Sequence, residues 1–75
     1  MENISIHTED IQLDQFLKIA GAVMTGGEVK AWIADERILK NGEVETARRR
    51  KLHDGDVITL ITDDGKVEYK VVREG

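Results

Sequence analysis

The residues with the most distinctive chemistry in this chain are four consecutive cations, Arg48, Arg49, Arg50 and Lys51. The guanidinium group of arginine donates hydrogen bonds in a fixed fork that matches the oxygen atoms of a phosphate, and its flat face stacks on bases. Three arginines in a row cannot all point into a protein core, so the run must lie at the surface. This cationic run, residues 48–51, therefore predicts a surface that attracts a polyanion and neutralises its phosphates.

A second interpretation of the cationic run requires no ligand. Glu43 and Glu45 precede the run on a predicted strand, and their carboxylates could pair with its cations in a solvated loop. Exposed ion pairs contribute only about 0–1 kcal/mol to stability, so phosphate groups would displace them readily. Polyanion binding is therefore the interpretation that we favour.

The distribution of charge singles out the same part of the chain. The formal net charge of the 75 residues is −4. Residues 1–29 contribute −4 and residues 52–75 contribute −3, whereas residues 30–51 contribute +3. An acidic protein repels a polyanion at long range unless its cations are concentrated on one surface. We therefore expect the middle segment to form the functional surface.

The composition argues against several other classes of protein. The chain has no cysteine, and its two histidines, His7 and His53, lie far apart, so no metal or other cofactor is expected. No nucleophile, base and orienting group occur together, so no catalytic residue and no enzymatic activity are expected. No apolar run approaches the ~20 residues of a membrane span, and residues 1–3 lack the features of a secretory signal. We therefore expect a cytoplasmic, monomeric, single-domain protein that does not contact a membrane.

Two amphipathic helices are predicted in the first half of the chain. The first has an apolar stripe formed by Leu13, Phe16, Leu17 and Ala20. Thr8 or Asp10 is expected to cap this helix. The second opens with Thr25-Gly26-Gly27-Glu28, which has the spacing of a capping box. Its apolar face is formed by Val29, Trp32 and Ile33, so Trp32 is expected in the core rather than on a base-stacking surface.

Strands are predicted on both sides of the helices. Ile4-Ser5-Ile6 alternates as a short strand does. Residues 38–45 indicate a hairpin around Asn41-Gly42, the preferred pair for a type I′ turn. Asp54-Gly55-Asp56 is expected to be a turn, and Asp63-Asp64-Gly65 joins two β-rich segments. The order β-α-α-β-β-β-β predicts an α+β fold in which two N-terminal helices pack on a small antiparallel sheet.

Several short motifs, each common by itself, follow one another in a specific order and spacing. They are Leu13-Asp14-Gln15-Phe16-Leu17-Lys18, Gly26-Gly27-Glu28-Val29-Lys30, Asn41-Gly42-Glu43-Val44-Glu45, Arg48 to Leu52 and Gly55-Asp56-Val57-Ile58. Together they resemble the S4 RNA-binding domain, and most closely its small stand-alone bacterial version of the YaaA type. The resemblance covers residues 13–58, and residues 59–75 would add the C-terminal hairpin strands of one domain spanning residues 1–75.

The resemblance implies where RNA would bind. In S4 domains, whose helices and sheet form the αL motif, RNA lies against the second helix and the loop after the Asn-Gly hairpin. The implied RNA contacts are Lys30, Arg48, Arg49, Arg50 and Lys51, with Gly26 and Gly27 at the helix start. Apart from the resemblance, Arg37 and Lys40 flank the helix-to-strand junction and could widen the basic surface, and we rank them below the cationic run. The chain departs from the family where it has Asp35-Glu36-Arg37-Ile38, since a small residue and then Gly-Val-type residues are usual there. It also has Ala47 where a further arginine is common.

The glycine pair at the start of the second helix has two interpretations from physical chemistry alone. A helix N-terminus exposes unpaired N–H groups with about half a positive charge, and Gly26-Gly27 would let a phosphate approach the backbone. Alternatively, the glycines form a tight turn, and Glu28 completes the cap at the same positive end. The residues by themselves favour the second interpretation, because helix starts are far more numerous than phosphate sites.

The expected partner is structured RNA, either ribosomal or transfer RNA, and through it the ribosome. Binding would depend mostly on phosphate contacts, with RNA shape giving selectivity. The alternative is a protein-interaction module that docks its basic loop on an acidic protein partner. DNA binding is a weaker third hypothesis, because the chain offers no obvious recognition helix with base-reading side chains.

Overall fold

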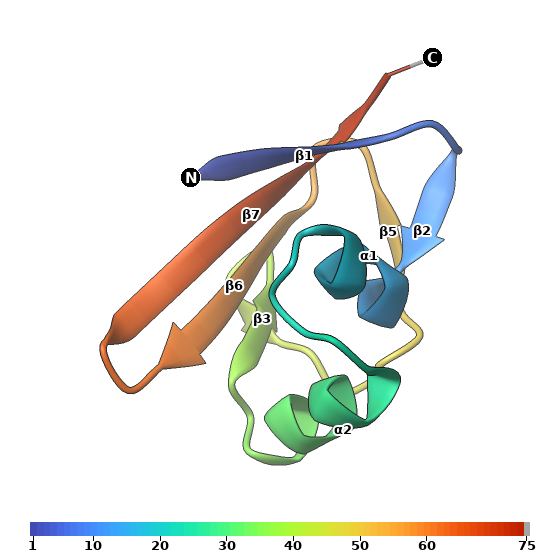
Figure 1. Cartoon of the computed structure of the whole chain (residues 1–75). Helices are drawn as coiled ribbons and strands as arrows, with labels where there is room; N and C mark the ends of the chain where they lie inside the picture. The colour runs from blue at the N-terminus through green and yellow to red at the C-terminus, as the bar shows by residue number, and fades with distance from the viewer. Residues whose placement is uncertain (75) are drawn as a thin grey trace.

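The computed structural model describes residues 1–74 and confirms the α+β class (Figure 1). In chain order the elements are β1 (Glu2–Ile6), β2 (Asp10–Gln12), α1 (Leu13–Ile19), α2 (Gly26–Ala34), β3 (Ile38–Lys40), β4 (Glu43–Val44), β5 (Lys51–His53), β6 (Val57–Thr62) and β7 (Gly65–Arg73). Gly75, the last residue of the predicted domain, lies outside the described residues. No helix within residues 1–74 is long and apolar enough to cross a membrane.

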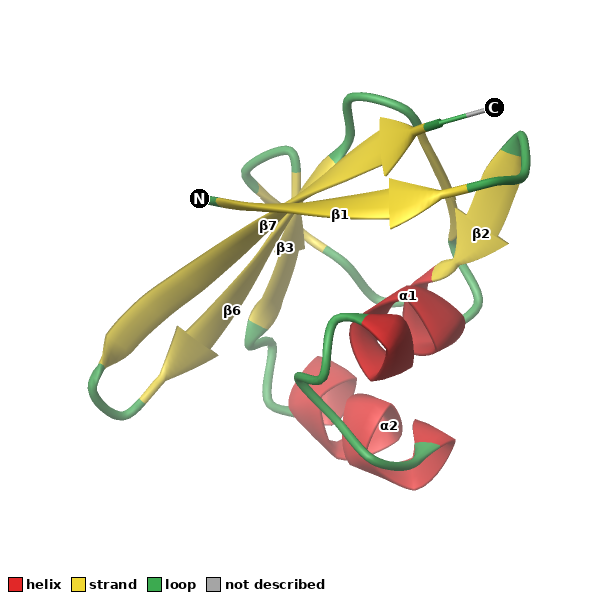
Figure 2. Cartoon of the chain, turned by 45° about the horizontal axis from the view of Figure 1, so that its top comes forward, coloured by secondary structure: helices red, strands yellow, loops and turns green. Residues whose placement is uncertain are grey.

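The main sheet has five strands in the order β1-β7-β6-β3-β4, and β2 and β5 form a separate antiparallel pair. The prediction of an antiparallel sheet is wrong for one pairing, because β1 runs parallel to β7, with Ile4 opposite Val71 (Figure 2). The remaining pairings of the main sheet are antiparallel, so the sheet is mixed. Hairpin signals report only strands that are neighbours in sequence, whereas β1 and β7 stand at opposite ends of the chain.

The prediction of two N-terminal helices is also wrong, because two strands, β1 and β2, precede α1. The strand expected at Ile4–Ile6 is present within β1, but β2 was not expected. Residues 10–12 are extended because they pair with residues 51–53 of β5. Neither Thr8 nor Asp10 caps α1, since the N-cap position is Gln12, whose side chain makes no capping hydrogen bond.

Both helices cover one face of the main sheet and share its hydrophobic core. The fully buried side chains of this core are Leu13, Phe16, Leu17, Val29, Ile38, Leu52, Ile58 and Val71. Phe16 meets Tyr69 edge to face, with ring centroids 6.5 Å apart, and this contact joins α1 to β7. Trp32 packs against the core as predicted but is only half-buried.

The two hairpin turns predicted from the sequence are present in the structure. Asn41 and Gly42 have φ angles of 52° and 86°, as a type I′ turn requires, and they join β3 to β4. β6 and β7 form the second predicted hairpin, in which Thr62 pairs with Gly65. Short polar turns of this kind are specified by the residues within them, so the sequence alone locates them.

The end of α2 contains a residue in an unfavourable backbone conformation. The amides of Glu36 and Arg37 donate to the carbonyl oxygens of Ile33 and Trp32, which is the Schellman pattern of a helix C-terminus. This pattern places Glu36 in the left-handed region with a φ of 58°. Glycine adopts this conformation without the steric penalty that a Cβ atom causes.

Replacing Glu36 by glycine is expected to raise the free energy of unfolding by about 0.5–1 kcal/mol. The left-handed penalty of about 1–2 kcal/mol disappears, and the larger entropy of glycine in the unfolded chain offsets part of that gain. Urea unfolding at neutral pH measures the change. Glu36→Ala is the matched control, because it removes the same charge but keeps a Cβ atom. An equal gain in both variants would show that the backbone conformation is not the cause.

Candidate nucleic-acid interface

Most of the cationic run folds into a tight turn at the surface. The amide of Arg50 donates to the carbonyl oxygen of Ala47 over 3.1 Å, so residues 47–50 form a four-residue turn with Arg48 and Arg49 at its centre. We call residues 47–50 the cationic turn. Arg49 is exposed, Arg48 is half-buried, and Lys51 follows as an exposed residue of β5. The predicted surface position of the run is confirmed.

The main chain of the cationic turn is bound to the start of α1. The amides of Leu13 and Asp14 donate to the carbonyl oxygens of Arg50 and Arg48 over 2.9 and 3.0 Å. These amides belong to the first turn of the helix, where N–H groups have no partner within the helix. The pairing therefore caps α1. It also points two carbonyl oxygens at the helix, and these oxygens would repel a phosphate if they faced solvent.

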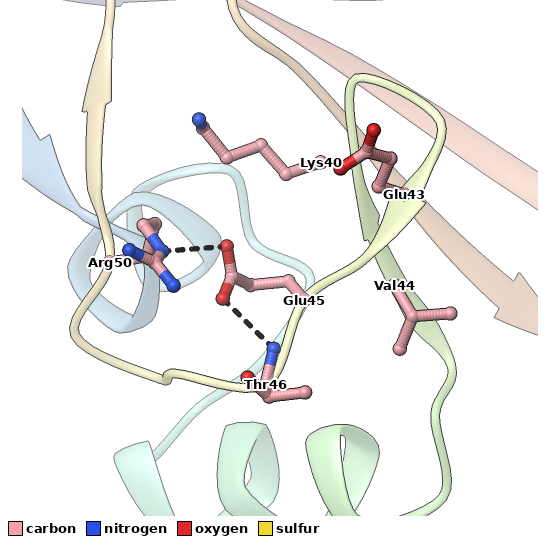
Figure 3. A pocket seen from close by; sticks show the side chains of 6 residues that line it. All are labelled: Lys40, Glu43, Val44, Glu45, Thr46 and Arg50. Atoms are coloured by element: carbon pink, nitrogen blue, oxygen red, sulfur yellow. Dashed lines mark hydrogen bonds and ion pairs between the residues drawn. The ribbon is translucent and has the colours of Figure 1, made fainter.

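A buried carboxylate, that of Glu45, fixes the cationic turn from the other side (Figure 3). Its Oε2 atom accepts hydrogen bonds from the amides of Thr46 and Ala47, and its Oε1 atom accepts from the Nε atom of Arg50. All three distances are 2.9 Å, and the residue is 6 % exposed. The pairing of the run with Glu45, which the ligand-free interpretation predicted, is present, whereas Arg50 is the only member of the run that forms it within residues 1–74.

The environment of Glu45 lowers its pKa. Burial alone would raise the pKa of this carboxyl, but hydrogen bonds from Arg50, Ala47 and Thr46, together with the charge of Arg50, outweigh that effect. The carboxylate is therefore held in its charged form in the folded protein. This buried negative charge orders the backbone and the Arg50 side chain around it, because each of these donors forms a hydrogen bond to it.

An open polar hollow of about 230 Å³ lies beside this carboxylate (Figure 3). Its lining comprises Lys40, Glu43, Val44, Glu45, Thr46 and Arg50. Two of the predicted contact residues, Lys40 and Arg50, are thus brought to one site although they are ten positions apart in the sequence. Their charges are balanced there by two glutamates, so the hollow itself is not strongly basic.

Hydrogen bonds join two of the sequence motifs, the Asn41-Gly42 turn and the Gly55-Asp56-Val57 segment. The side chain of Asn41 donates to Asp56 over 3.1 Å and accepts from the amide of Val57 over 2.9 Å. Asp56 also accepts from the amide of His53 over 2.7 Å. Burial would raise the pKa of Asp56, but these hydrogen bonds and the nearby charge of Lys40 hold it below its ordinary value. Both aspartates of the predicted turn bind the backbone, since Asp54 likewise accepts from the amide of Arg73.

The start of α2 is capped by protein groups and lies close to the cationic turn. Thr25 Oγ1 accepts from the amide of Glu28, which confirms the Thr25 half of the predicted capping box. The Glu28 carboxylate accepts from the amide of Met24 rather than from that of Thr25. A Cβ atom at Gly26 would lie 3.9 Å from the Asp14 carboxylate, and the amide of Asp14 is the one bound to Arg48. Two carboxylates therefore already face the positive end of α2, and Lys30 is an exposed residue of this helix.

Arg37 contacts a different part of the molecule from the cationic turn. Its Nη1 atom lies 3.4 Å from the carboxylate of Asp63 in the turn between β6 and β7, and its carbonyl oxygen accepts from the amide of Ile61. α2 has nine residues and is therefore about 13 Å long, which separates Arg37 from the start of that helix. The structure thus brings Lys40 to the same hollow as Arg50, places Gly26 near Asp14, whose amide binds the cationic turn, and places Arg37 beyond the far end of α2.

The fold and this arrangement define the chain as a member of the S4 domain family, whose model matches residues 4–71. The resemblance read from the sequence motifs is confirmed at the level of the family, and the assignment to the YaaA type stays a prediction. The chain is also 44 % identical over 69 residues to the probable ribosome maturation protein RlbA of Bacillus subtilis (strain 168). The match covers 92 % of this chain and 93 % of that protein.

Sequence reasoning did not assign a role to Asp14 or the full role of Glu45. The hydrophobic pattern gave no signal for Glu45, because Val44 is exposed and Glu45 is buried, the reverse of the usual preference. The link of Asp14 to the cationic turn depends on its backbone amide, which every residue except proline possesses. One usable signal was the spacing of an acid and an arginine five residues apart on either side of a turn.

Replacing Glu45 by glutamine is expected to lower the free energy of unfolding at neutral pH by about 1–3 kcal/mol, because charge-assisted hydrogen bonds are lost at a buried site. Since the pKa of Glu45 is lower in the folded chain than in the unfolded chain, protonation favours unfolding. Its contribution is complete above the ordinary value of 4.5 and is lost as the pH falls through the folded-state pKa. The difference between the wild type and the variant should therefore shrink in acid, as chemical unfolding across this pH range will measure.

Glu43→Gln is the matched control for this experiment. Glu43 is an exposed neighbour in the same hollow, so its replacement should change stability by less than about 0.5 kcal/mol at any pH. A Glu45→Gln deficit of constant size from neutral to acidic pH would contradict a role for the carboxylate charge.

Proposed function

We propose that this protein binds structured RNA, ribosomal or transfer RNA, through a surface centred on the cationic turn. It acts in the cytoplasm, in association with the ribosome, as a monomer and without catalysis. The observation that supports this most directly is the cationic turn itself, whose carbonyl oxygens are engaged by α1 while Arg49 is exposed. Membership of the S4 domain family and similarity to a protein named as a probable ribosome maturation protein support the same role.

The cations contribute unequally to the proposed surface. Arg48, Arg49 and Lys51 form no ion pair within residues 1–74 and are available to phosphates. Arg50 uses its Nε atom on Glu45, and its side chain is still 50 % exposed, which leaves its two Nη groups for an RNA contact. These residues form the centre of the surface. The outer members are Lys40, Lys30, Gly26, Gly27 and Arg37.

The physical mechanism is the neutralisation of phosphates with release of their counterions. Such binding weakens steeply as salt concentration rises, with a log–log slope of about −0.9 for each phosphate neutralised on a duplex. The acidic remainder of the chain suppresses binding to bulk RNA, since long-range repulsion acts on every polyanion alike. A site that fits the fixed shape of the cationic turn would therefore be favoured over unstructured RNA.

Removing three cations from the centre tests this proposal. The triple variant Arg48→Ala/Arg49→Ala/Lys51→Ala, which spares Arg50, is expected to bind purified bacterial ribosomal RNA at least tenfold more weakly. Its salt slope should fall by about two to three, one for each lost phosphate contact. Filter binding or fluorescence anisotropy at several salt concentrations measures both quantities.

The matched control is Lys66→Ala/Lys70→Ala/Arg73→Ala. It removes the same number of charges from exposed residues of β7 and so produces the same net charge. This control should retain most of the wild-type affinity. Equal losses in the two variants would show that net charge alone drives binding, and an unchanged affinity in the first variant would overturn the proposal.

A capture experiment separates RNA binding from the protein-interaction alternative. The protein is expected to recover ribosomal or transfer RNA from a bacterial extract and to lose its captured material after ribonuclease treatment. An acidic protein partner that remains bound after digestion, and that the triple variant no longer captures, would favour the alternative instead.

A further inference from the structure

We propose that Glu45 is a positioning residue for RNA binding, which it promotes even though its charge has the same sign as that of RNA. This inference rests on the function proposed above and specifies how its central surface is made competent. Glu45 itself would not contact the ligand. It would hold the cationic turn and the guanidinium group of Arg50 in the arrangement that phosphates bind.

The contacts of Glu45 connect three parts of the molecule. Its amide donates to the carbonyl oxygen of Ile38 over 2.8 Å, which ties the residue to β3 of the main sheet. Its carboxylate binds the amides of Thr46 and Ala47, where the cationic turn begins, and the side chain of Arg50, where that turn ends. One side chain therefore fixes both ends of the turn relative to the sheet.

This arrangement removes a conformational cost from RNA binding. A surface loop ordered only by its ligand must lose its backbone and side-chain freedom when the ligand binds, and the affinity falls accordingly. Between Glu45 and α1, the polar main-chain groups at both ends of the cationic turn are engaged before any ligand is present. The ordering cost is thus met during folding rather than during binding.

Arg50 shows why the hydrogen bond matters in addition to the charge. A guanidinium group has five N–H donors in one plane, so fixing the Nε atom orients the two Nη groups. Because the Nε–Oε1 distance is 2.9 Å and half of the Arg50 side chain is exposed, the group is held without being hidden. Lysine would keep the positive charge at this position but could not present the same planar fork.

Simple electrostatics predicts the opposite effect of Glu45. A carboxylate beside a phosphate-binding surface repels the ligand, so its removal should strengthen binding. Glu43 lines the same hollow, is exposed, and makes no side-chain hydrogen bond within residues 1–74, so it reports this charge effect alone. The two glutamates therefore give variants with equal charge changes and opposite expected results.

The experiment measures binding of purified bacterial ribosomal RNA by Glu45→Gln, Glu43→Gln and Arg50→Lys at one salt concentration. Glu45→Gln is expected to weaken binding about tenfold despite the loss of a negative charge, and Glu43→Gln to leave it unchanged or strengthen it slightly. Arg50→Lys should also weaken binding about tenfold at an unchanged net charge. It keeps the proposal falsifiable if Glu45→Gln folds poorly, because an Arg50→Lys variant that binds as tightly as the wild type would show that the guanidinium group held by Glu45 is not needed, and Arg50 is an exposed residue.

Two further readouts separate positioning from a general loss of structure. In Glu45→Gln the amide hydrogens of Thr46 and Ala47 should exchange faster, while those in the interior of α1 stay protected. The double variant Glu45→Gln/Arg50→Lys should bind more tightly than two independent losses would give, because the two residues act through one contact. Additive losses with uniform deprotection would indicate a purely structural role and overturn the inference.

The outcome also distinguishes this inference from the proposed function. If the triple variant of the cationic run binds RNA as the wild type does, the proposed function fails and the positioning role fails with it. If the triple variant loses binding while Glu45→Gln and Arg50→Lys bind as tightly as the wild type, only the positioning role of Glu45 is overturned.

Discussion

The amides at the start of α1 impose the constraint on which much of this small domain depends. A helix begins with N–H groups that have no partner within it, and leaving them unsatisfied in a folded protein is costly. Here the side chain of the N-cap residue Gln12 makes no capping bond, and the carbonyl oxygens of Arg48 and Arg50 accept from the first two amides of the helix instead. The first helix therefore completes its end only when a segment about 35 residues later in the chain has reached it. The antiparallel pairing of β2 with β5 continues directly from these contacts.

Opposite charges in the middle segment have different structural roles. Glu45 is buried and binds main-chain amides, whereas the cations beside it remain accessible. Asp56, just beyond the segment, likewise uses its charge on the backbone and on Asn41. The carboxylates of this region therefore order its backbone, while the cations stay accessible to a ligand.

Local features of the fold could be predicted from the sequence because the residues that specify them lie close together. Thr25 with Glu28, and Asn41 with Gly42, each fix a cap or a turn through their own side chains or backbone freedom. The parallel pairing of β1 with β7 and the capping of α1 could not be predicted, since both consist of main-chain hydrogen bonds between distant segments. Such bonds place no requirement on residue type.

The candidate site divides in the same way. Exposure of the cationic run follows from its composition, and the run was located correctly. Which cations are bound by an acid does not follow from the composition. Arg50 is bound by an acid that the hydrophobic pattern does not mark as buried, and Arg37 is bound by Asp63 from another hairpin.

The pairing of β1 with β7 has a further consequence for how the domain folds. Glu2 lies opposite Tyr69, so β1 cannot join the sheet until β7, a strand distant in sequence, is available. Contacts this far apart in sequence slow folding. Until β1 pairs with it, the edge of β7 is therefore open to other strands.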